Sequence, residues 1–207
     1  METQSEVTII NYGMGNLHSV QKGFEKVGIS TTISQDPKDI LNAKRIVLPG
    51  VGAFKDCMEN LNRLNLLDPI LKSIETGKPY LGICLGLQIL FTESDEFGPS
   101  PGLGIFPGRV RRFMALDIKI PHMGWNQVNF SKQIPCLQDI SDGTFFYFVH
   151  SYHVDPLDED IIATTTNYGI EFVSSISKDN IFACQFHPEK SQKEGLKILK
   201  NFGRALC

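Results

Sequence analysis

The chain has 207 residues, 21% of them charged and 42% hydrophobic, with a formal net charge of −3. This size predicts one globular domain over 1–207. The slightly acidic balance, without clustered lysine and arginine, excludes a nucleic-acid-binding footprint. The polar, acidic start at 1–6 predicts no export signal, and no apolar run reaches the roughly 20 residues that span a membrane, so we expect a cytoplasmic protein.

The N-terminal half alternates apolar runs of strand length with segments of helical spacing. Helices are expected over 17–27, where Gly28 ends the pattern, and over 66–74. The expected strands are 7–12, 29–33, 44–48 and a run from Tyr80 that ends at Cys84. Because strands that alternate with helices form βαβ units, this half predicts an α/β fold with a parallel sheet.

The pattern changes after about residue 97. A loop rich in glycine and proline over 97–104 precedes several short strand-like runs, which turn residues separate, and these predict antiparallel hairpins added to the sheet. Ser191 is expected to cap a last helix over 192–206. The expected strands are 108–113, 125–130, 144–154, 161–166, 172–177 and 181–186.

Cys84 gives the strongest functional signal. It lies in Gly82-Ile83-Cys84-Leu85-Gly86, directly after the apolar pair Tyr80-Leu81. A strand that ends between two glycines and enters a helix must turn sharply, which holds the residue at the turn in a strained conformation with its side chain exposed. The helix N-terminus that follows favours a thiolate. A structural cysteine would need neither glycine, so the pattern predicts a nucleophile.

A base for this nucleophile is expected in Gln185-Phe186-His187-Pro188-Glu189. Proline holds the residue before it extended, and in an extended segment residues i and i+2 share a face. The Glu189 carboxylate can therefore reach the His187 imidazole and fix its tautomer. Cys84, His187 and Glu189 are predicted to be nucleophile, base and orienting carboxylate.

The stretches 82–88 and 186–191 resemble the signature of class I, triad-type, glutamine amidotransferases. Within that family, further stretches resemble the glutaminase subunits of imidazole glycerol phosphate synthases: Tyr12–Leu17, Pro49–Phe54, Pro121–Asn126 and His150–His153. The resemblance extends from the first strand to the last helix. One position departs, because the family commonly has an aspartate where this chain has Asn11.

The resemblance implies an open, mixed, mostly parallel central sheet of flavodoxin-like type, with helices on both faces and antiparallel strands in the C-terminal half. It also implies hydrolysis of the side-chain amide of L-glutamine through a cysteine thioester, with no cofactor. The oxyanion would be stabilised by backbone N–H groups of Leu85 and of the turn at Val51 and Gly52. The residues implied to bind glutamine are Gln88, Gly52, Ser151 and Tyr152.

The same resemblance implies a heterodimer with a (β/α)8-barrel cyclase subunit, which would use the ammonia to make imidazole glycerol phosphate and AICAR in histidine biosynthesis. The residues implied at the interface are Asn16, Trp125 and Lys190. Other hypotheses stay open at this point. The ammonia could serve a different synthase, such as one that amidates a surface sugar, or the fold could be a non-catalytic binding module or a cysteine peptidase.

Three weaker patterns predict no further site. The start Tyr12-Gly13-Met14-Gly15 is similar to a dinucleotide-binding turn, but His18 stands where the third glycine belongs. His150 and His153 would point to opposite faces of a strand, so no metal site is predicted. The cysteines at 57, 84, 136, 184 and 207 include no CxxC pair and are expected to be free thiols.

Overall fold

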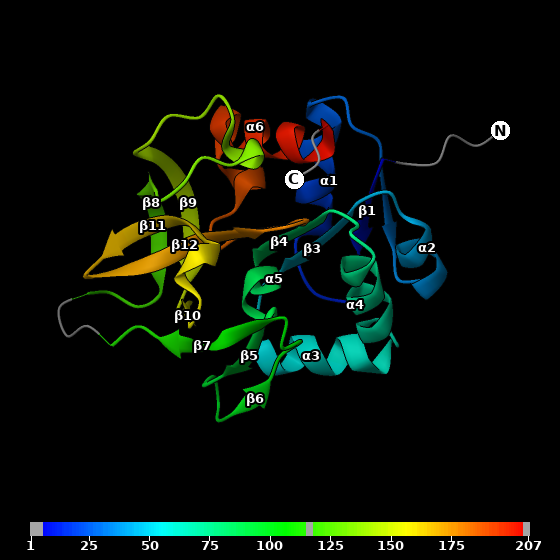
Figure 1. The fold of residues 1–207 in the computed structure, drawn as a ribbon, viewed down its shortest axis with the longest axis horizontal. Coiled ribbons are helices and arrows are strands. Elements are labelled where there is room, and N and C mark those ends of the chain that lie inside the picture. The colour runs from blue at the N-terminus through cyan, green and yellow to red at the C-terminus, as the bar shows by residue number, and fades with distance from the viewer. Residues whose placement is uncertain (1–5, 115–117, 205–207) are drawn as a thin grey trace.

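A mixed sheet runs through the middle of the computed structural model, which describes residues 6–114 and 118–204 (Figure 1). Five neighbouring strands of this sheet are parallel, and each occupies a segment that the sequence predicts as strand. In spatial order they are β2 (Thr31–Ser34), β1 (Val7–Ile10), β3 (Ile46–Gly50), β4 (Tyr80–Cys84) and β13 (Ile181–Cys184). The last of these comes from the C-terminal half, so the two halves of the chain meet between β4 and β13.

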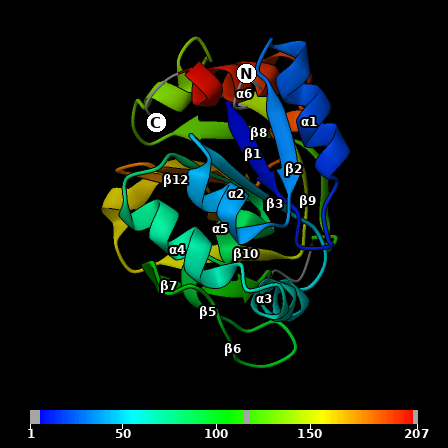
Figure 2. The same cartoon turned by 90° about the vertical axis from the view of Figure 1, so that its right-hand side faces the viewer.

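Helices cover both faces of this parallel region (Figure 2). On one face lie α1 (Leu17–Lys26) and α6 (Gln192–Arg204), and on the other lie α2 (Pro37–Asn42), α3 (Phe54–Arg63) and α4 (Leu67–Glu75). Strands that are buried on both faces are apolar throughout. Val47 accordingly faces the core under α1 and α6, and its neighbours Ile46 and Leu48 face the opposite core.

The two predicted helices of the N-terminal half are confirmed, but α2 and α3 were not predicted. The first, α2, has six residues, which is too short for a periodic pattern, and Asp36 caps it through a bond to the Lys38 N–H. In α3 the buried residues Phe54, Cys57 and Leu61 do have helical spacing. Their signal is weak because, apart from Met58, charged and amide residues fill the rest of the helix.

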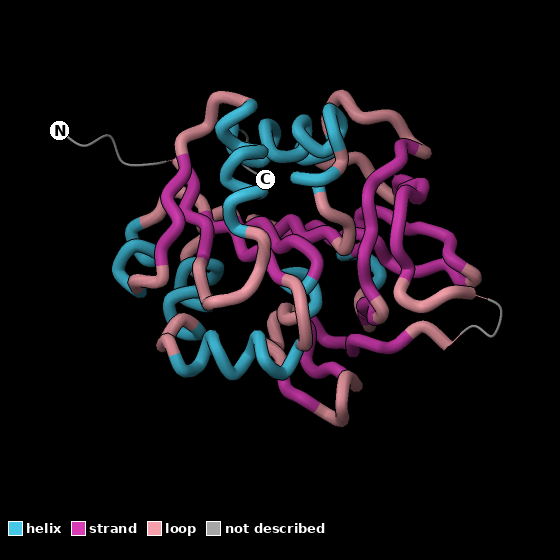
Figure 3. Tube along the Cα trace, turned by 180° about the vertical axis from the view of Figure 1, so that it is seen from behind, coloured by secondary structure: helices cyan, strands magenta, loops and turns pink. Residues whose placement is uncertain are grey.

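The strands of the C-terminal half extend the sheet and add a hairpin (Figure 3). β12 (Ile170–Lys178) is antiparallel to β13, and the sheet continues through β10 (Tyr152–Pro156), β7 (Phe106–Arg112), β5 (Phe91–Ser94) and β6 (Ser100–Pro101). β11 (Ile162–Tyr168) pairs with β12 and with β8 (His122–Phe130), and β8 pairs with β9 (Thr144–His150).

One expected strand is wrong as a continuous unit. The run 144–154 divides at Ser151 into β9 and β10, because β9 pairs with β8 whereas β10 pairs with β7 and β12. The division is important for the site, because Ser151 lines the same cavity as Cys84 at the end of β4.

The expectation that all the cysteines are free thiols is also wrong. Cys57, Cys84 and Cys184 are free, but Cys136 is disulfide-bonded. Cysteine spacing alone does not reveal which side chains meet in space. Cys207 lies outside the described residues. In the described part of the chain, none of the helices is long and apolar enough to cross a membrane.

Candidate active site

Cys84 stands at a sharp turn between β4 and the short helix α5 (Leu85–Gln88), with a φ of 55° and a ψ of −104°. This left-handed conformation is strained for a residue with a Cβ atom. Both flanking glycines are required, because a Cβ at Gly86 would meet the carbonyl oxygen of Leu48 and one at Gly82 would meet that of Gly86. The predicted turn is confirmed. The predicted exposure is wrong, since Cys84 is only 6% exposed and lies in the wall of a cavity.

The pairing of β13 with β4 brings His187 to this turn. Cys184 lies opposite Ile83 in the register, so the chain leaves β13 beside the end of β4. The backbone of His187 is then fixed at both groups: its N–H donates to the Tyr147 carbonyl (2.9 Å), and its carbonyl accepts from the Ser191 hydroxyl (2.7 Å). The hydroxyl of Ser191, the residue directly before α6, therefore helps to fix the backbone of His187.

The carboxylate of Glu189 meets the ring of His187 as the spacing predicts. Its Oε1 lies 2.8 Å from Nδ1, and both side chains are 2% exposed. Burial alone would lower the pKa of His187, but the Cys84 sulfur and the Glu189 carboxylate outweigh it and raise this pKa to about 10. Nε2 is buried without a hydrogen bond to any described residue. The ring therefore holds a proton at neutral pH on the side of the sulfur.

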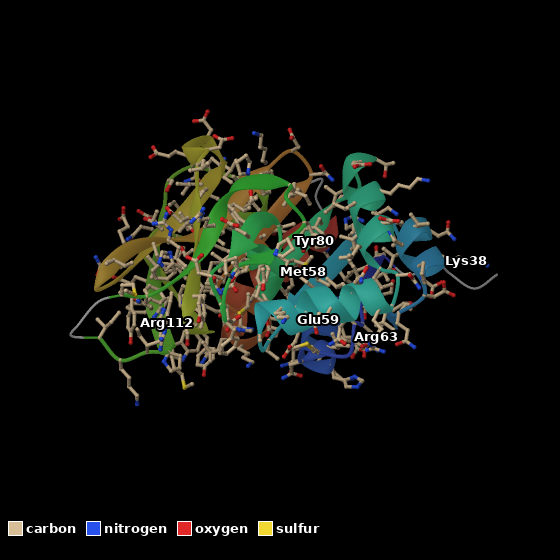
Figure 4. The ribbon with its side chains drawn as sticks, turned by 90° about the horizontal axis from the view of Figure 1, so that it is seen from below. Lys38, Met58, Glu59, Arg63, Tyr80 and Arg112 are labelled. Carbon is tan, nitrogen blue, oxygen red and sulfur yellow. The ribbon has the colours of Figure 1, made fainter. Side chains whose placement is uncertain are left out.

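A cavity of about 380 Å³ opens beside Cys84. Of the residues predicted to bind glutamine or an oxyanion, all six line it: Val51, Gly52, Leu85, Gln88, Ser151 and Tyr152. Lys190, predicted at the interface, lines it too, whereas Asn16 and Trp125 do not. A larger hollow of about 660 Å³ lies between α3 and the loop 97–102, and Met58 and Glu59 of α3, which line it, are labelled in Figure 4. Its lining residues include no cysteine or histidine, so we assign the site to the first cavity.

Gln88 connects the cavity wall to Cys84 through a residue that the sequence did not reveal. Its Nε2 donates to the Tyr152 carbonyl (3.0 Å) and to Gln185 Oε1 (3.0 Å). Gln185 in turn directs its Nε2 toward the sulfur of Cys84, at 3.5 Å. Because both hydrogens of the Gln88 amide nitrogen are used, its oxygen is the atom left to accept from a bound molecule.

Glu96 is a second cavity residue that sequence analysis missed. It follows β5, and its Oε2 accepts from the Phe54 N–H at 2.7 Å, so the start of α3 holds its carboxylate in place. No local motif marks it. At the N-terminal turn, the amide oxygen of Asn11 accepts from the Gly13 N–H (3.0 Å), a bond that needs no charge.

Two of the residues predicted at the interface, Trp125 on β8 and Lys190 after β13, contact the same tyrosine ring on β9. The Trp125 ring lies 6.2 Å from that of Tyr147, edge to face, and the Lys190 ammonium lies 5.8 Å from the same Tyr147 ring. Alternation along β8 and β9 exposes Met123 (62%), Trp125 (46%) and Phe145 (51%). We call Met123, Trp125, Phe145 and Tyr147 the outer hairpin face. Asn16 is exposed elsewhere, as the cap of α1.

Comparison with known proteins gives the class first. A family described as "Glutamine amidotransferase class-I" matches residues 8–206, so the chain belongs to the class-I glutamine amidotransferases. Among solved structures, PurLQS from Thermotoga maritima is similar in fold, with a TM-score of 0.75 at 17% identity, covering 95% of this chain and 96% of the other.

The names of more similar relatives define a narrower family within this class. The imidazole glycerol phosphate synthase subunit HisH of Geobacter sulfurreducens is 54% identical, covering 96% of this chain and 98% of that protein. The subunit of the same name from Aquifex aeolicus is 55% identical, covering 95% of each chain. Within the class, the chain therefore belongs to the family of HisH subunits.

Proposed function

We propose that this chain is a glutaminase that hydrolyses the side-chain amide of L-glutamine and supplies the ammonia to a cyclase subunit for histidine biosynthesis. The observation that carries the proposal is that Cys84 lines a cavity and interacts with His187, whose imidazole lies 2.8 Å from the Glu189 carboxylate. The HisH relatives favour a cyclase of histidine biosynthesis, rather than another synthase, as the enzyme that uses the ammonia. The cytoplasm is the compartment that we propose.

The reaction begins when the Cys84 sulfur attacks the amide carbon of glutamine. The oxyanion would accept from the Leu85 N–H and from an N–H of the turn at Val51 and Gly52. His187, protonated at neutral pH, gives its proton to the amide nitrogen, the C–N bond breaks, and ammonia leaves. Water then attacks the thioester and gives one proton to His187, so that glutamate leaves and the cysteine and histidine regain their starting forms.

The cavity suits a free amino acid. Its volume of about 380 Å³ lies within the usual range of small-molecule sites. The free amide oxygen of Gln88 can accept from the substrate, the backbone at Ser151 and Tyr152 lies along its wall, and the fixed carboxylate of Glu96 can pair with the α-ammonium group. A peptidase would need an extended cleft, so a single amino acid is the better fit.

The outer hairpin face is the surface that we propose for the cyclase (β/α)8-barrel in a heterodimer. Three large apolar side chains are exposed there together, which is typical of a protein interface. Lys190 lies against this face and also lines the cavity, so the partner would contact the mouth of the glutaminase site. Asn16 would add a polar contact from the start of α1.

The decisive experiment compares two buried cysteines. Cys84→Ala should lower glutamate production from glutamine by about 10⁴-fold or more, measured with the cyclase subunit present. Cys184→Ala is the matched control, because Cys184 is 0% exposed on the adjacent strand and should keep the activity. Undiminished hydrolysis in Cys84→Ala, or an inactive native complex, would overturn the proposed function.

A further inference from the structure

Two histidines that the proposed reaction does not use lie in contact behind the glutamine cavity. His122 on β8 and His150 at the end of β9 are 2% and 6% exposed, and His150 lines the cavity. Nδ1 of His122 is 2.9 Å from Nε2 of His150. The His122 ring stacks on Phe148 and on Tyr168, with centroids 4.8 and 3.9 Å apart, so its orientation is fixed by packing.

The direction of the hydrogen bonds follows from the two ends of this group. The Tyr152 carbonyl can only accept, so Nδ1 of His150, 2.8 Å away, carries a hydrogen. At the other end, the amide orientation of Asn126 is set by two bonds: its Oδ1 accepts from the Gln127 N–H (2.8 Å), and its Nδ2 donates to the Asn167 carbonyl (2.9 Å). Nδ2 is therefore the atom that faces His122.

The tautomers of both rings are thereby determined. Nδ2 of Asn126 donates to Nε2 of His122 at 3.1 Å, so this nitrogen has no hydrogen. In a neutral His122 the hydrogen then lies on Nδ1 and points to Nε2 of His150, which accepts it. Each ring accepts a hydrogen bond at Nε2 and donates one from Nδ1, so the donors all point in one direction along the chain of bonds from Asn126 to Tyr152.

We propose that Asn126, His122 and His150 form a histidine relay that positions the Tyr152 carbonyl in the glutamine pocket. The carbonyl oxygen accepts from Nδ1 of His150 and from Nε2 of Gln88, so both of its lone pairs are occupied. The relay thus fixes the acceptor that orients the Gln88 amide and leaves its oxygen toward the substrate. His122 and His150 are positioning residues, and their assignment to glutamine binding rests on the proposed function.

The environment keeps both rings neutral. Burial lowers the pKa of His122 to about 4 and that of His150 to about 3. The titratable groups that face His150 are His122 on β8, His153 on β10 and His187 after β13, and all three disfavour a further positive charge there. A proton on Nε2 of His150 would also oppose the Nδ1–H of His122. The relay is therefore intact at neutral pH.

A spectroscopic experiment tests the relay without measuring activity. Long-range ¹H–¹⁵N spectra of the native protein at about pH 7 should show a protonated Nδ1 and an unprotonated Nε2 in both His122 and His150. The free neutral imidazole prefers the opposite tautomer, so the result is diagnostic. An Nε2–H form of either ring would overturn the proposal, and the proposed glutaminase activity would be unaffected by that outcome.

A pair of substitutions tests the positioning role. His150→Leu removes the donor to Tyr152, whereas His150→Asn can place an amide N–H near the position of Nδ1. With the cyclase subunit present, His150→Leu should raise KM for glutamine about fivefold to tenfold, as expected for one hydrogen bond, and change kcat less. His150→Asn should return KM to within about twofold of the native value. Equal KM values in the two variants would overturn the role.

Folding and the proposed function are controlled separately. If circular dichroism shows that His150→Leu is unfolded, His122→Leu and His122→Asn give the same comparison one step further from the pocket, since the asparagine keeps a donor toward His150. A native complex that does not hydrolyse glutamine refutes the proposed function. An active native complex in which neither pair differs in KM refutes the relay alone.

Discussion

Glu189 influences the proposed reaction through the histidine that it contacts. Its carboxylate is one of the two groups that raise the pKa of His187 to about 10 against the effect of burial. Glu189→Gln keeps the shape and removes the charge, so we expect the pKa of His187 to fall and kcat to fall by about 10³–10⁴-fold. An NMR titration of the imidazole measures the first effect.

Asp158→Asn is the control for that titration. Asp158 is a partly exposed carboxylate that pairs with Lys178 at 3.0 Å and does not line the cavity. Its loss should leave the pKa of His187 and kcat unchanged. If Glu189→Gln also leaves both unchanged, the carboxylate does not orient the base.

Local chemistry explains which site residues could be predicted. Cys84, His187 and Glu189 were found because two glycines and one proline constrain the backbone next to them. Gln185, Glu96 and His122 were missed, since each meets the site through bonds to residues far away in the sequence. A buried amide or imidazole in a strand has no spacing that distinguishes a positioning role from simple packing.

The turn between β4 and α5 depends on the close approach of three elements. A side chain at Gly86 would collide with the backbone of β3 at Leu48, which cannot move without displacing the parallel region. Gly86→Ala should lower the free energy of unfolding by about 1–3 kcal/mol and also lower glutaminase activity, since Cys84 and Leu85 would shift. Urea unfolding and activity per folded molecule measure the two effects.

Gly98→Ala separates backbone strain from this collision. Gly98 has a φ of +99°, and a Cβ there would contact nothing within 4 Å. The substitution should cost about 1–2 kcal/mol through strain and leave activity unchanged. Full activity in folded Gly86→Ala would contradict the argument that this glycine is needed for the turn.

Element prediction succeeded where a single pattern dominated. The parallel strands β1, β3, β4 and β13 were found because both of their faces are buried, and α1 because its buried and exposed sides alternate with helical period. The division at Ser151 could not be predicted, because no glycine or proline marks the point where the chain changes partners from β8 to β7. Strand partners, rather than propensity, set that boundary.

Across the whole molecule, buried histidines make stability depend on pH in two directions. Burial lowers the pKa values of His122, His150 and His153, so the unfolded chain binds protons more readily than the folded one. The contribution of these neutral rings to the free energy of unfolding is therefore lost as pH falls below about 6.5. The raised pKa of His187 acts oppositely, and its contribution is lost as pH rises toward about 10.

The free energy of unfolding should therefore be greatest near pH 6.5. Urea unfolding at about pH 4.5, 6.5 and 9 measures it, with His122→Asn expected to flatten the acid side. His18→Asn is the control, because His18 is exposed and belongs to no buried group. A stability that stays constant from pH 4.5 to 6.5 would show that the buried rings do not resist protonation.

Association with a partner is the property of the whole molecule that the outer hairpin face predicts. Trp125 is exposed beside two other large apolar residues and packs edge to face on Tyr147, so it can anchor an interface. Trp125→Ala should raise the Kd for the cyclase subunit about 30-fold, as for a side chain worth about 2 kcal/mol, measured by calorimetry.

Phe97→Ala is the matched control, because Phe97 is 84% exposed in the loop beside α3 and should leave Kd unchanged. Equal Kd values in the two variants would place the partner on another surface, whereas a selective loss that saturating cyclase restores would tie the hairpin to assembly rather than to chemistry.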